Sequence, residues 1–354
     1  MKKIFTTLMA ICLMVSVLSV TAINAFAAEA PAEGVVLSVS AQKRDGTIVP
    51  IENGNFKNFE EGWEAAVDYA EDKDTMKNNG YDRIVVDFYT DWTANEDGEF
   101  GDGGDGFEWS TIHITEDIRI TLNLNNHTIN RNLKEWEYDG EVIYIDDNAD
   151  VIINNGTIKG GYSNSEGGGL YIEGGANVTL NDVHIVGNKV HNDDGAGIYM
   201  YGGSNLTVNG GSFENNTTNG NGWATYYGGA VYVEEGTAKF NNVVFKNNQS
   251  QYRGAAIYDD SSDVTIKNCT FDGNEAEYST FAAYAGGSSF DVSGSTFVNS
   301  KSKYMFDFLA CRIVFNPIIK WCKLECICLI VVDHLRITNN CKCIIIFSNR
   351  RLIL

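Results

Sequence analysis

Tyrosine and acidic residues recur two positions apart in the central part of the chain. The pairs are Tyr171 with Glu173, Tyr232 with Glu234, and Tyr258 with Asp260. Carboxylates on neighbouring strands could bind calcium, or could act as the two acids of a glycoside hydrolase. Tyrosine rings could stack on sugars or pack against a flanking loop. A solvated acidic face that prevents lateral association of the sheet explains the same residues, and it is the preferred interpretation.

Further aromatic candidates lie at the end of a long insertion, residues 217–227. Loops on a rigid scaffold commonly carry binding residues. A carbohydrate platform is therefore one interpretation of these side chains, and cover for the adjacent sheet is the other. Together with the paired tyrosines, the predicted ligand-binding residues are Tyr171, Tyr199, Trp223, Tyr226, Tyr227 and Tyr232.

Basic and calcium-binding candidates are few. Arg253 is the only arginine between Leu133 and Ser302 and could act as a base beside Glu173, Glu234 and Asp260. The segment GDGGDG at 101–106, with Asp102 and Asp105, resembles a calcium loop but lacks the spacing and closing glutamate of an EF-hand. A flexible acidic loop is the preferred interpretation of this segment, and calcium binding is the alternative. Apart from this possible calcium ion, no cofactor is expected.

The elements that would position these residues repeat along the chain. Three columns of residues advance in step, by 26 to 33 residues per copy. The first column is Tyr144, Tyr171, Tyr199, Tyr232, Tyr258 and Tyr284. The second is Ile153, Leu180, Val208, Phe240, Ile266 and Val292. The third is Ile158, Ile185, Phe213, Phe245, Phe271 and Phe297. Repeats of this length are typical of solenoids, propellers and arrays.

Short alternating segments break at Asn, Asp and Gly, so the repeats are predicted to be strands and not helices. A period of 26–28 residues fits one coil of a parallel β-helix with three short strands. Leu170 and Ile172 should then face inward. The predicted outward column is Asp146, Glu173, Tyr201, Glu234 and Asp260, with uncertain orientation at Asp147 and Asp259. A further column, Asn188, Asn216, Asn248 and Asn274, should form a structural asparagine ladder in a turn.

The two ends differ from the repeats. Residues 1–27 have the basic, apolar and Ala-x-Ala pattern of a secretory signal peptide, and no transmembrane helix is expected after its removal. Residues 28–117 are predicted to form a cap, with a helix at 62–73 and a strand at 81–92. Residues 118–302 are predicted to form the β-helix. Residues 303–354 are Cys-rich and hydrophobic, lack glycine and continue no column, so they could be an aberrant tail or a plug.

The charge limits the partners. Residues 29–302 contain 16 basic and 44 acidic residues, which gives a net charge of −28. Such a body should repel nucleic acid and anionic membranes, and it suits cations or neutral and basic surfaces.

The segments GGGLY, GAGIY and GGAVY, with GWEAAVDYA and LNLNNHTINR before them, resemble the right-handed parallel β-helix regions of secreted bacterial surface proteins, in the pectate-lyase-like superfamily. The resemblance covers roughly residues 60–302 and implies about seven coils behind an α/β cap. That fold hosts lyases, hydrolases and adhesins alike. The chain departs from the enzymes, since it has no second basic residue beside Arg253 and no Gly-His-Gly motif.

The sequence therefore predicts a secreted or cell-surface protein that is non-catalytic and binds polysaccharide or host and matrix surfaces. The alternative is a polysaccharide lyase or glycoside hydrolase that acts along one face of the β-helix.

Overall fold

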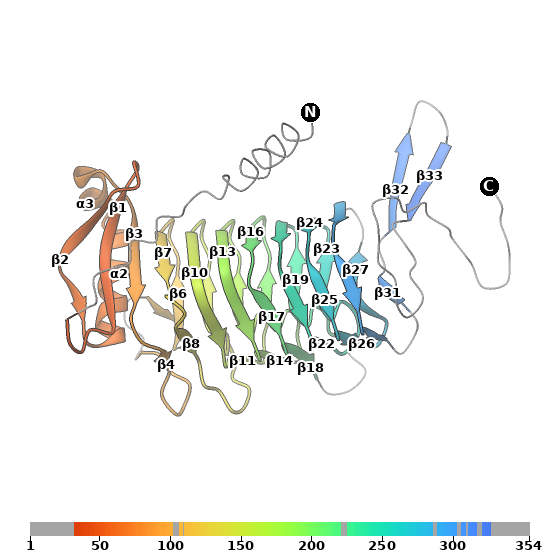
Figure 1. Ribbon diagram of the computed structural model, residues 1–354, viewed down its shortest axis with the longest axis horizontal. Helices are drawn as coiled ribbons and strands as arrows, with labels where there is room; N and C mark the ends of the chain where they lie inside the picture. Colours follow the sequence, from red (N-terminus) through yellow and green to blue (C-terminus); the bar gives the residue numbers. More distant parts are fainter. Residues whose placement is uncertain are drawn as a thin grey trace, which may run out of the picture. The chain divides into compact units, whose positions relative to one another are not determined.

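A computed structural model describes residues 32–101, 106–108, 110–220, 225–285, 289–302, 306–308, 311–316 and 321–326. The part from Val35 onward forms one compact unit, a parallel β-solenoid whose coils lie side by side behind a small α/β cap (Figure 1). No helix in the described residues is both long enough and apolar enough to cross a membrane.

Three sheets run along the solenoid. Sheet A carries two strands or one bent strand per coil: β4 (Trp92–Thr93), β7 (Arg119–Asn123), β8 (Thr128–Asn130), β10 (Asp150–Lys159), β13 (Asn177–Val186), β16 (Asn205–Asn209), β17 (Ser212–Glu214), β20 (Thr237–Asn241), β21 (Val244–Lys246), β24 (Asp263–Lys267), β25 (Thr270–Asp272), β28 (Ser289–Ser293) and β29 (Thr296–Val298). Sheet B contains β5 (Phe107–Glu108), β6 (Thr111–Ile114), β9 (Ile143–Ile145), β12 (Leu170–Ile172), β15 (Ile198–Met200), β19 (Val231–Glu234), β23 (Ile257–Asp260), β27 (Ser279–Ala285) and β31 (Phe306–Phe308). Sheet C contains β11 (Tyr162–Ser163), β14 (Lys189–His191), β18 (Thr217–Asn219), β22 (Gln249–Ser250), β26 (Glu275–Ala276) and β30 (Lys301–Ser302).

The six strands of sheet C mark about six turns, against the seven coils expected from the sequence. The difference lies at the cap end. There β6, β7 and β8 begin a coil, but its third side contributes an isolated bridge, Glu137 to Ser163, in place of a strand.

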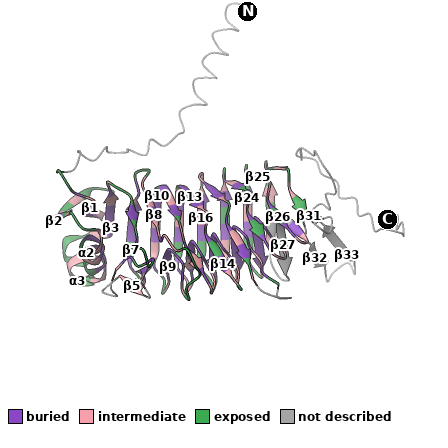
Figure 2. Ribbon diagram, turned by 90° about the horizontal axis from the view of Figure 1, so that it is seen from below, coloured by how far each residue is buried: buried purple, intermediate pink, exposed green. Residues whose placement is uncertain are grey.

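The second and third predicted columns are confirmed by the strand register. Ile153 pairs with Leu180 and Ile158 with Ile185, and the later coils follow the same pattern. Phe213, Phe245, Phe271 and Phe297 stack in sequence, with ring centroids 5.1, 4.7 and 4.9 Å apart. Figure 2 shows buried positions recurring along β7, β10, β13 and β16.

The first column holds as far as Tyr258. The next strand pairs Ala283 with Tyr258 and Tyr284 with Asp259, so the expected place of Tyr284 was wrong by one residue. A slip of one residue moves a side chain to the other face of a strand. Asp259 illustrates the alternation, because it aligns with Val233 and is fully buried, while Asp147 lies in a turn with a φ of 43°.

The asparagine ladder is also confirmed. Asn188, Asn216, Asn248 and Asn274 are fully buried. The backbone N–H of each of the first three donates to the side-chain oxygen of the next asparagine, at 3.0 or 3.1 Å.

The cap extends sheet A. Strands β1 (Leu37–Lys43) and β2 (Ile48–Phe56) pair antiparallel, β1 pairs with β3 (Tyr81–Phe88), and β3 runs parallel to β7. Helix α2 (Phe59–Glu71) begins where the Asn58 side chain accepts from two backbone N–H groups. Gly62 allows α2 to approach β1, because a Cβ there would lie 2.5 Å from Leu37. Helix α3 (Lys73–Asn79) has no buried residue (Figure 2).

Beyond sheet B, β32 (Cys311–Asn316) and β33 (Trp321–Cys326) form an antiparallel pair. The predicted signal peptide, residues 1–27, and most of the tail lie outside the described residues.

Candidate functional site

A row of tyrosines covers the outer face of sheet B. We call this row the tyrosine ladder: Tyr144, Tyr171, Tyr199, Tyr232 and Tyr258. The parallel register of β9, β12, β15, β19 and β23 places them at one position per strand. Their ring centroids are 5.1, 5.4, 5.0 and 5.1 Å apart in sequence order.

The ladder is outward-facing but largely buried. Leu170 and Ile172, on either side of Tyr171 in the strand, are fully buried in the interior, as predicted. Tyr199, Tyr232 and Tyr258 are only 8%, 7% and 5% exposed, because each ring is covered by its neighbours. The middle of the ladder therefore presents ring edges and hydroxyl groups, and its ring faces are already in contact with other tyrosines.

Two further side chains flank the ladder at its ends. The imidazole of His113 in β6 stacks on Tyr144, with ring centroids 4.8 Å apart. Tyr227 packs on Tyr258 at 4.3 Å and thus covers the other end. Of the two interpretations of Tyr227, its position fits cover for the sheet.

The carboxylates two positions after the tyrosines accept hydrogen bonds from the ladder. Glu173 accepts from the hydroxyl groups of Tyr144 and, at 3.1 Å, Tyr171. Glu234 accepts from the Tyr199 hydroxyl at 2.7 Å. Burial and these carboxylates raise the pKa of Tyr144, Tyr171 and Tyr199 above the ordinary value of tyrosine. The phenols thus stay neutral and act as hydrogen-bond donors to Glu173 and Glu234.

At the cap end of this face His113 lies between two acids. Its Nδ1 is 3.2 Å from Glu108 and its Nε2 is 3.3 Å from Asp146. Burial raises the pKa of Asp146, but hydrogen bonds from His113 and Thr115 outweigh burial and leave that pKa below its ordinary value.

A second group of acids lies beside the middle of the ladder. Asp193 and Asp194 follow β14 and precede β15. Burial, together with the charges of Asp193, Glu166 and Glu234, raises the pKa of Asp194 to about 8, although a hydrogen bond of 2.6 Å from the Tyr227 N–H acts to lower that pKa. Burial and Glu166 raise the pKa of Asp193 to about 6. This group therefore contains one carboxyl, Asp194, whose neutral form is favoured at neutral pH.

Arg253 lies at the same end of the tyrosine ladder as Tyr227, because an isolated backbone bridge pairs the two residues. Its guanidinium lies over the rings of Tyr252 and Tyr278, 4.8 and 5.6 Å from their centroids. In the described part of the chain no ion pair joins it to a carboxylate, and its buried Nε has no hydrogen-bond partner. The structure thus brings Glu234 and Asp260 together on adjacent strands, but gives Arg253 aromatic neighbours.

The remaining predicted residues lie elsewhere. Tyr226 is 8% exposed and donates to Asn192 at 3.2 Å, and Asp260 accepts from Ser261. Trp223, Asp102 and Asp105 lie outside the described residues. Within the residues that the structure does describe, no group of three His, Cys, Asp or Glu side chains could hold a metal ion.

Sequence reasoning missed His113 and Glu166, and although the Asp-Asp pair of Asp193 and Asp194 is visible in the sequence, it was not selected as part of a site. His113 lies in the alternating segment TIHI and shares the register of Tyr144, which a search one coil further back would have found. The Asp-Asp pair stands directly before Gly-Ala-Gly at 195–197, where a turn leads into a sheet B strand. Its raised pKa values depend on burial, which no sequence pattern reveals.

Comparison with known proteins gives no significant match to a curated protein or to a solved structure. A family model described as the right-handed beta helix region matches residues 110–306, more than half of the chain. These are the residues that form the stacked coils and carry the tyrosine ladder. The chain belongs to the right-handed β-helix family.

Proposed function

We propose that this is a secreted or cell-surface protein that binds polysaccharide along the outer face of sheet B, without catalysis. The observation that carries the proposal is the repeated pairing of tyrosine hydroxyls with Glu173 and Glu234 on successive strands. Strands in a sheet repeat at about 4.8 Å, so the face offers a regular row of polar groups to a polymer. The signal-like start of the chain supports export.

The chemistry of the face favours a neutral or basic polymer. Carboxylates accept hydrogen bonds from sugar hydroxyl and amino groups, and the body of the chain repels polyanions. Because the inner tyrosine faces are covered, ring stacking on sugars would be confined to exposed aromatic groups such as Tyr201, which is 38% exposed. Hydrogen bonding is thus the main source of recognition in this proposal.

The test is affinity electrophoresis of the purified protein through gels that contain chitosan, a neutral β-glucan or polygalacturonate. We expect retardation by the basic or neutral polymer and none by polygalacturonate. The double variant Glu173→Gln with Glu234→Gln should lose roughly tenfold in affinity, since two charged hydrogen-bond acceptors are replaced.

The matched control is Glu275→Gln with Asp291→Asn, which changes the same charge on sheets C and A. Equal losses in both double variants would show a general effect of charge. Absence of retardation by all three polymers and of binding to a broad glycan array would remove the proposal.

A glycoside hydrolase is the second candidate, favoured by one observation. Asp194, with its pKa of about 8, could donate a proton at neutral pH, and Glu234 is the neighbouring carboxyl that could serve as the second acid of the pair. Release of reducing ends that is lost in both Asp194→Asn and Glu234→Gln would establish it. A lyase would instead form unsaturated products and would depend on Arg253, so Arg253→Ala separates the two reactions.

A further inference from the structure

A cleft in the cap collects positive charge in an otherwise acidic body. It has a volume of about 670 Å³ and lies between the β1–β2 turn, α3 and the start of β7. We call it the cap cleft, and five of the 16 basic residues of the body line it: Lys43, Arg44, Lys73, Lys77 and Arg119. The acidic residues that line it are Asp45, Asp82 and Asp117.

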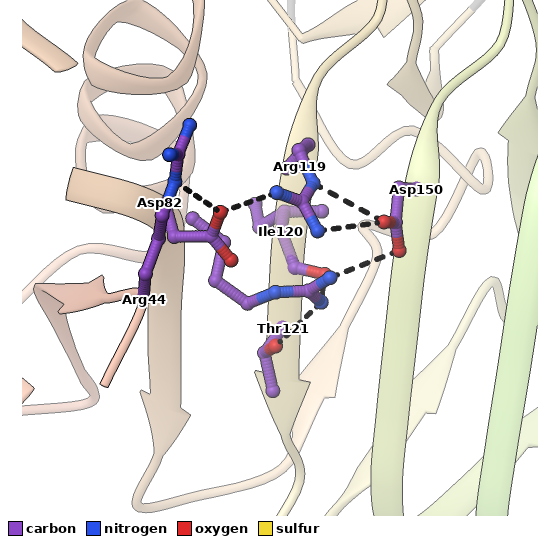
Figure 3. Close-up of polar contacts among 7 residues, drawn as sticks. Arg44, Asp82, Arg119, Ile120, Thr121 and Asp150 are labelled. Carbon is purple, nitrogen blue, oxygen red and sulfur yellow. Dashed lines mark hydrogen bonds and ion pairs between the residues drawn. The ribbon is translucent and has the colours of Figure 1, made fainter. Parts of the chain in front are cut away.

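The inner charges of the cap cleft neutralise each other. Arg119 binds Asp82 and, at 3.1 Å, Asp150, while Arg83 binds the other oxygen of Asp150 at 2.9 Å. Figure 3 shows Arg119 between Asp82 and Asp150, with Arg44 approaching Asp82 from the outer side. Arg83 is 5% exposed and also donates to Thr121 at 3.1 Å, so this network is a fixed floor.

The outer charges are not balanced. Arg44 is 90% exposed in its side chain, and its Nε is 4.0 Å from Asp82. Lys73 donates to the backbone oxygen of Glu116 at 2.8 Å, and it forms no ion pair among the described residues. Lys43 and Lys77 have no ion pair in the part of the chain that the structure describes. Four cations therefore face Asp45 and Asp117, a local excess of two positive charges.

The cap cleft also has an apolar wall, formed by Ala70, Met76 and Tyr81. Its volume lies within the range of small-molecule sites, about 300–1,000 Å³, and exceeds what a bare oxyanion needs. Lysine supplies point charges and arginine a planar fork, both suited to phosphate and sulfate oxygens. We propose that the cap cleft binds a phosphate or sulfate ester whose organic part lies against Met76 and Tyr81.

This proposal does not depend on polysaccharide binding by sheet B. The test is isothermal titration of the full-length protein with phenyl phosphate and phenyl sulfate, with inorganic phosphate and sulfate, and with phenol as the uncharged probe. We expect both esters to bind more tightly than the inorganic ions, and phenol not to bind. The preferred ester identifies which of the two sources the site serves. Affinity should fall as salt is added, because the cations are exposed.

Variants make the test specific. Lys43→Gln with Lys77→Gln should weaken ester binding roughly tenfold. Lys239→Gln with Lys246→Gln, at exposed positions of β20 and β21, should leave it unchanged. Asp45→Asn should tighten binding, because it removes a negative charge from the rim and keeps an acceptor for the Thr47 N–H.

Several results would overturn the proposal: no binding by either ester, equal binding by phenol, or equal affinity in the two double-lysine variants. Sedimentation provides a further check. If the protein self-associates and only the double variant Lys43→Gln with Lys77→Gln loses this association, the cap cleft receives the acidic body of a second copy. That result would also contradict an ester site.

Discussion

Single residues on the outer face of sheet B owe their protonation states to their surroundings. Glu173 and Glu234 are held by tyrosine hydroxyl groups, whereas Asp194 is half-buried among other acids. Carboxylates that look equivalent in the sequence therefore have different surroundings in the structure, and burial favours the neutral form of Asp194. Asp194 is the residue at which this difference can be measured.

Stability should depend on the ionisation of Asp194. Its folded pKa is raised from 3.8 to about 8, so the folded state keeps a proton that the unfolded state has lost. The stabilising contribution of Asp194 to the free energy of unfolding is complete below about pH 4 and disappears as the pH rises to about 8. Between these limits the free energy of unfolding falls by at most about 1.4 kcal/mol per pH unit. Asp193 and Glu141, with pKa values of about 6 and about 7, act in the same direction.

Urea unfolding between pH 5 and pH 8 measures this slope. Asp194→Asn should reduce it, because the amide stays neutral and can still accept the Tyr227 N–H. Asp291→Asn, on the outer face of β28, should retain the full slope. An unchanged slope in Asp194→Asn would contradict the assignment.

At the scale of single elements, each coil is fixed by ladders of identical side chains. The turn between sheets A and C is filled by buried asparagines, and the interior of sheet A by stacked phenylalanines. The Asn216 side chain makes four hydrogen bonds, two accepted from Asn188 and one each donated to Ile185 O and Asn248. Such a turn holds its shape only while every polar group has a partner.

Asn216→Ala should therefore be costly. It removes four hydrogen bonds in a fully buried turn and leaves donors of Asn188 unsatisfied, so we expect a loss on the order of 3 kcal/mol in the free energy of unfolding. Asn205→Ala, in the same coil, removes one exposed hydrogen bond to Asn177 and should cost less than about 1 kcal/mol. Denaturant unfolding gives both values, and similar losses would show that the buried ladder is not special.

For the described unit as a whole, the coils behave as a stack in which each contacts its neighbours. Such a stack exposes an apolar end unless a capping element covers it. Here β1 and β3 extend sheet A, and α2 closes the end with Trp63, which is fully buried. The Trp63 indole N–H donates to Gly106 O at 2.8 Å, so the cap is joined to the first residues of sheet B.

Trp63→Ala should loosen the cap end first. Truncation of a buried tryptophan costs about 3–5 kcal/mol. Hydrogen exchange should accelerate in β1, β3 and β7, and remain slow in β20 and β24, several coils away. Phe245→Ala, in the middle of the stack, should instead accelerate exchange in β20 and β24. Uniform acceleration along all coils in Trp63→Ala would indicate that the unit unfolds as one body.

Much of this architecture follows from the sequence alone. The alternation of Leu170, Tyr171 and Ile172, repeated at a nearly constant period, requires parallel coils with an inner and an outer face. The asparagine and phenylalanine columns follow from the same period, because stacked coils place like residues over one another. The helix around Trp63 was found by its spacing, although it begins at Phe59, earlier than predicted.

The tertiary structure decided what the period could not. The one-residue slip at Tyr284 and the incomplete coil at the cap depend on loop geometry. The covered faces of Tyr199 and Tyr232 depend on stacking, and the raised pKa of Asp194 on burial beside Glu166 and Glu234. The cap cleft joins Lys43, Lys77 and Arg119, which are far apart in the chain. A sequence determines which residues alternate and repeat, whereas charge and solvent exposure depend on neighbours that only the folded chain provides.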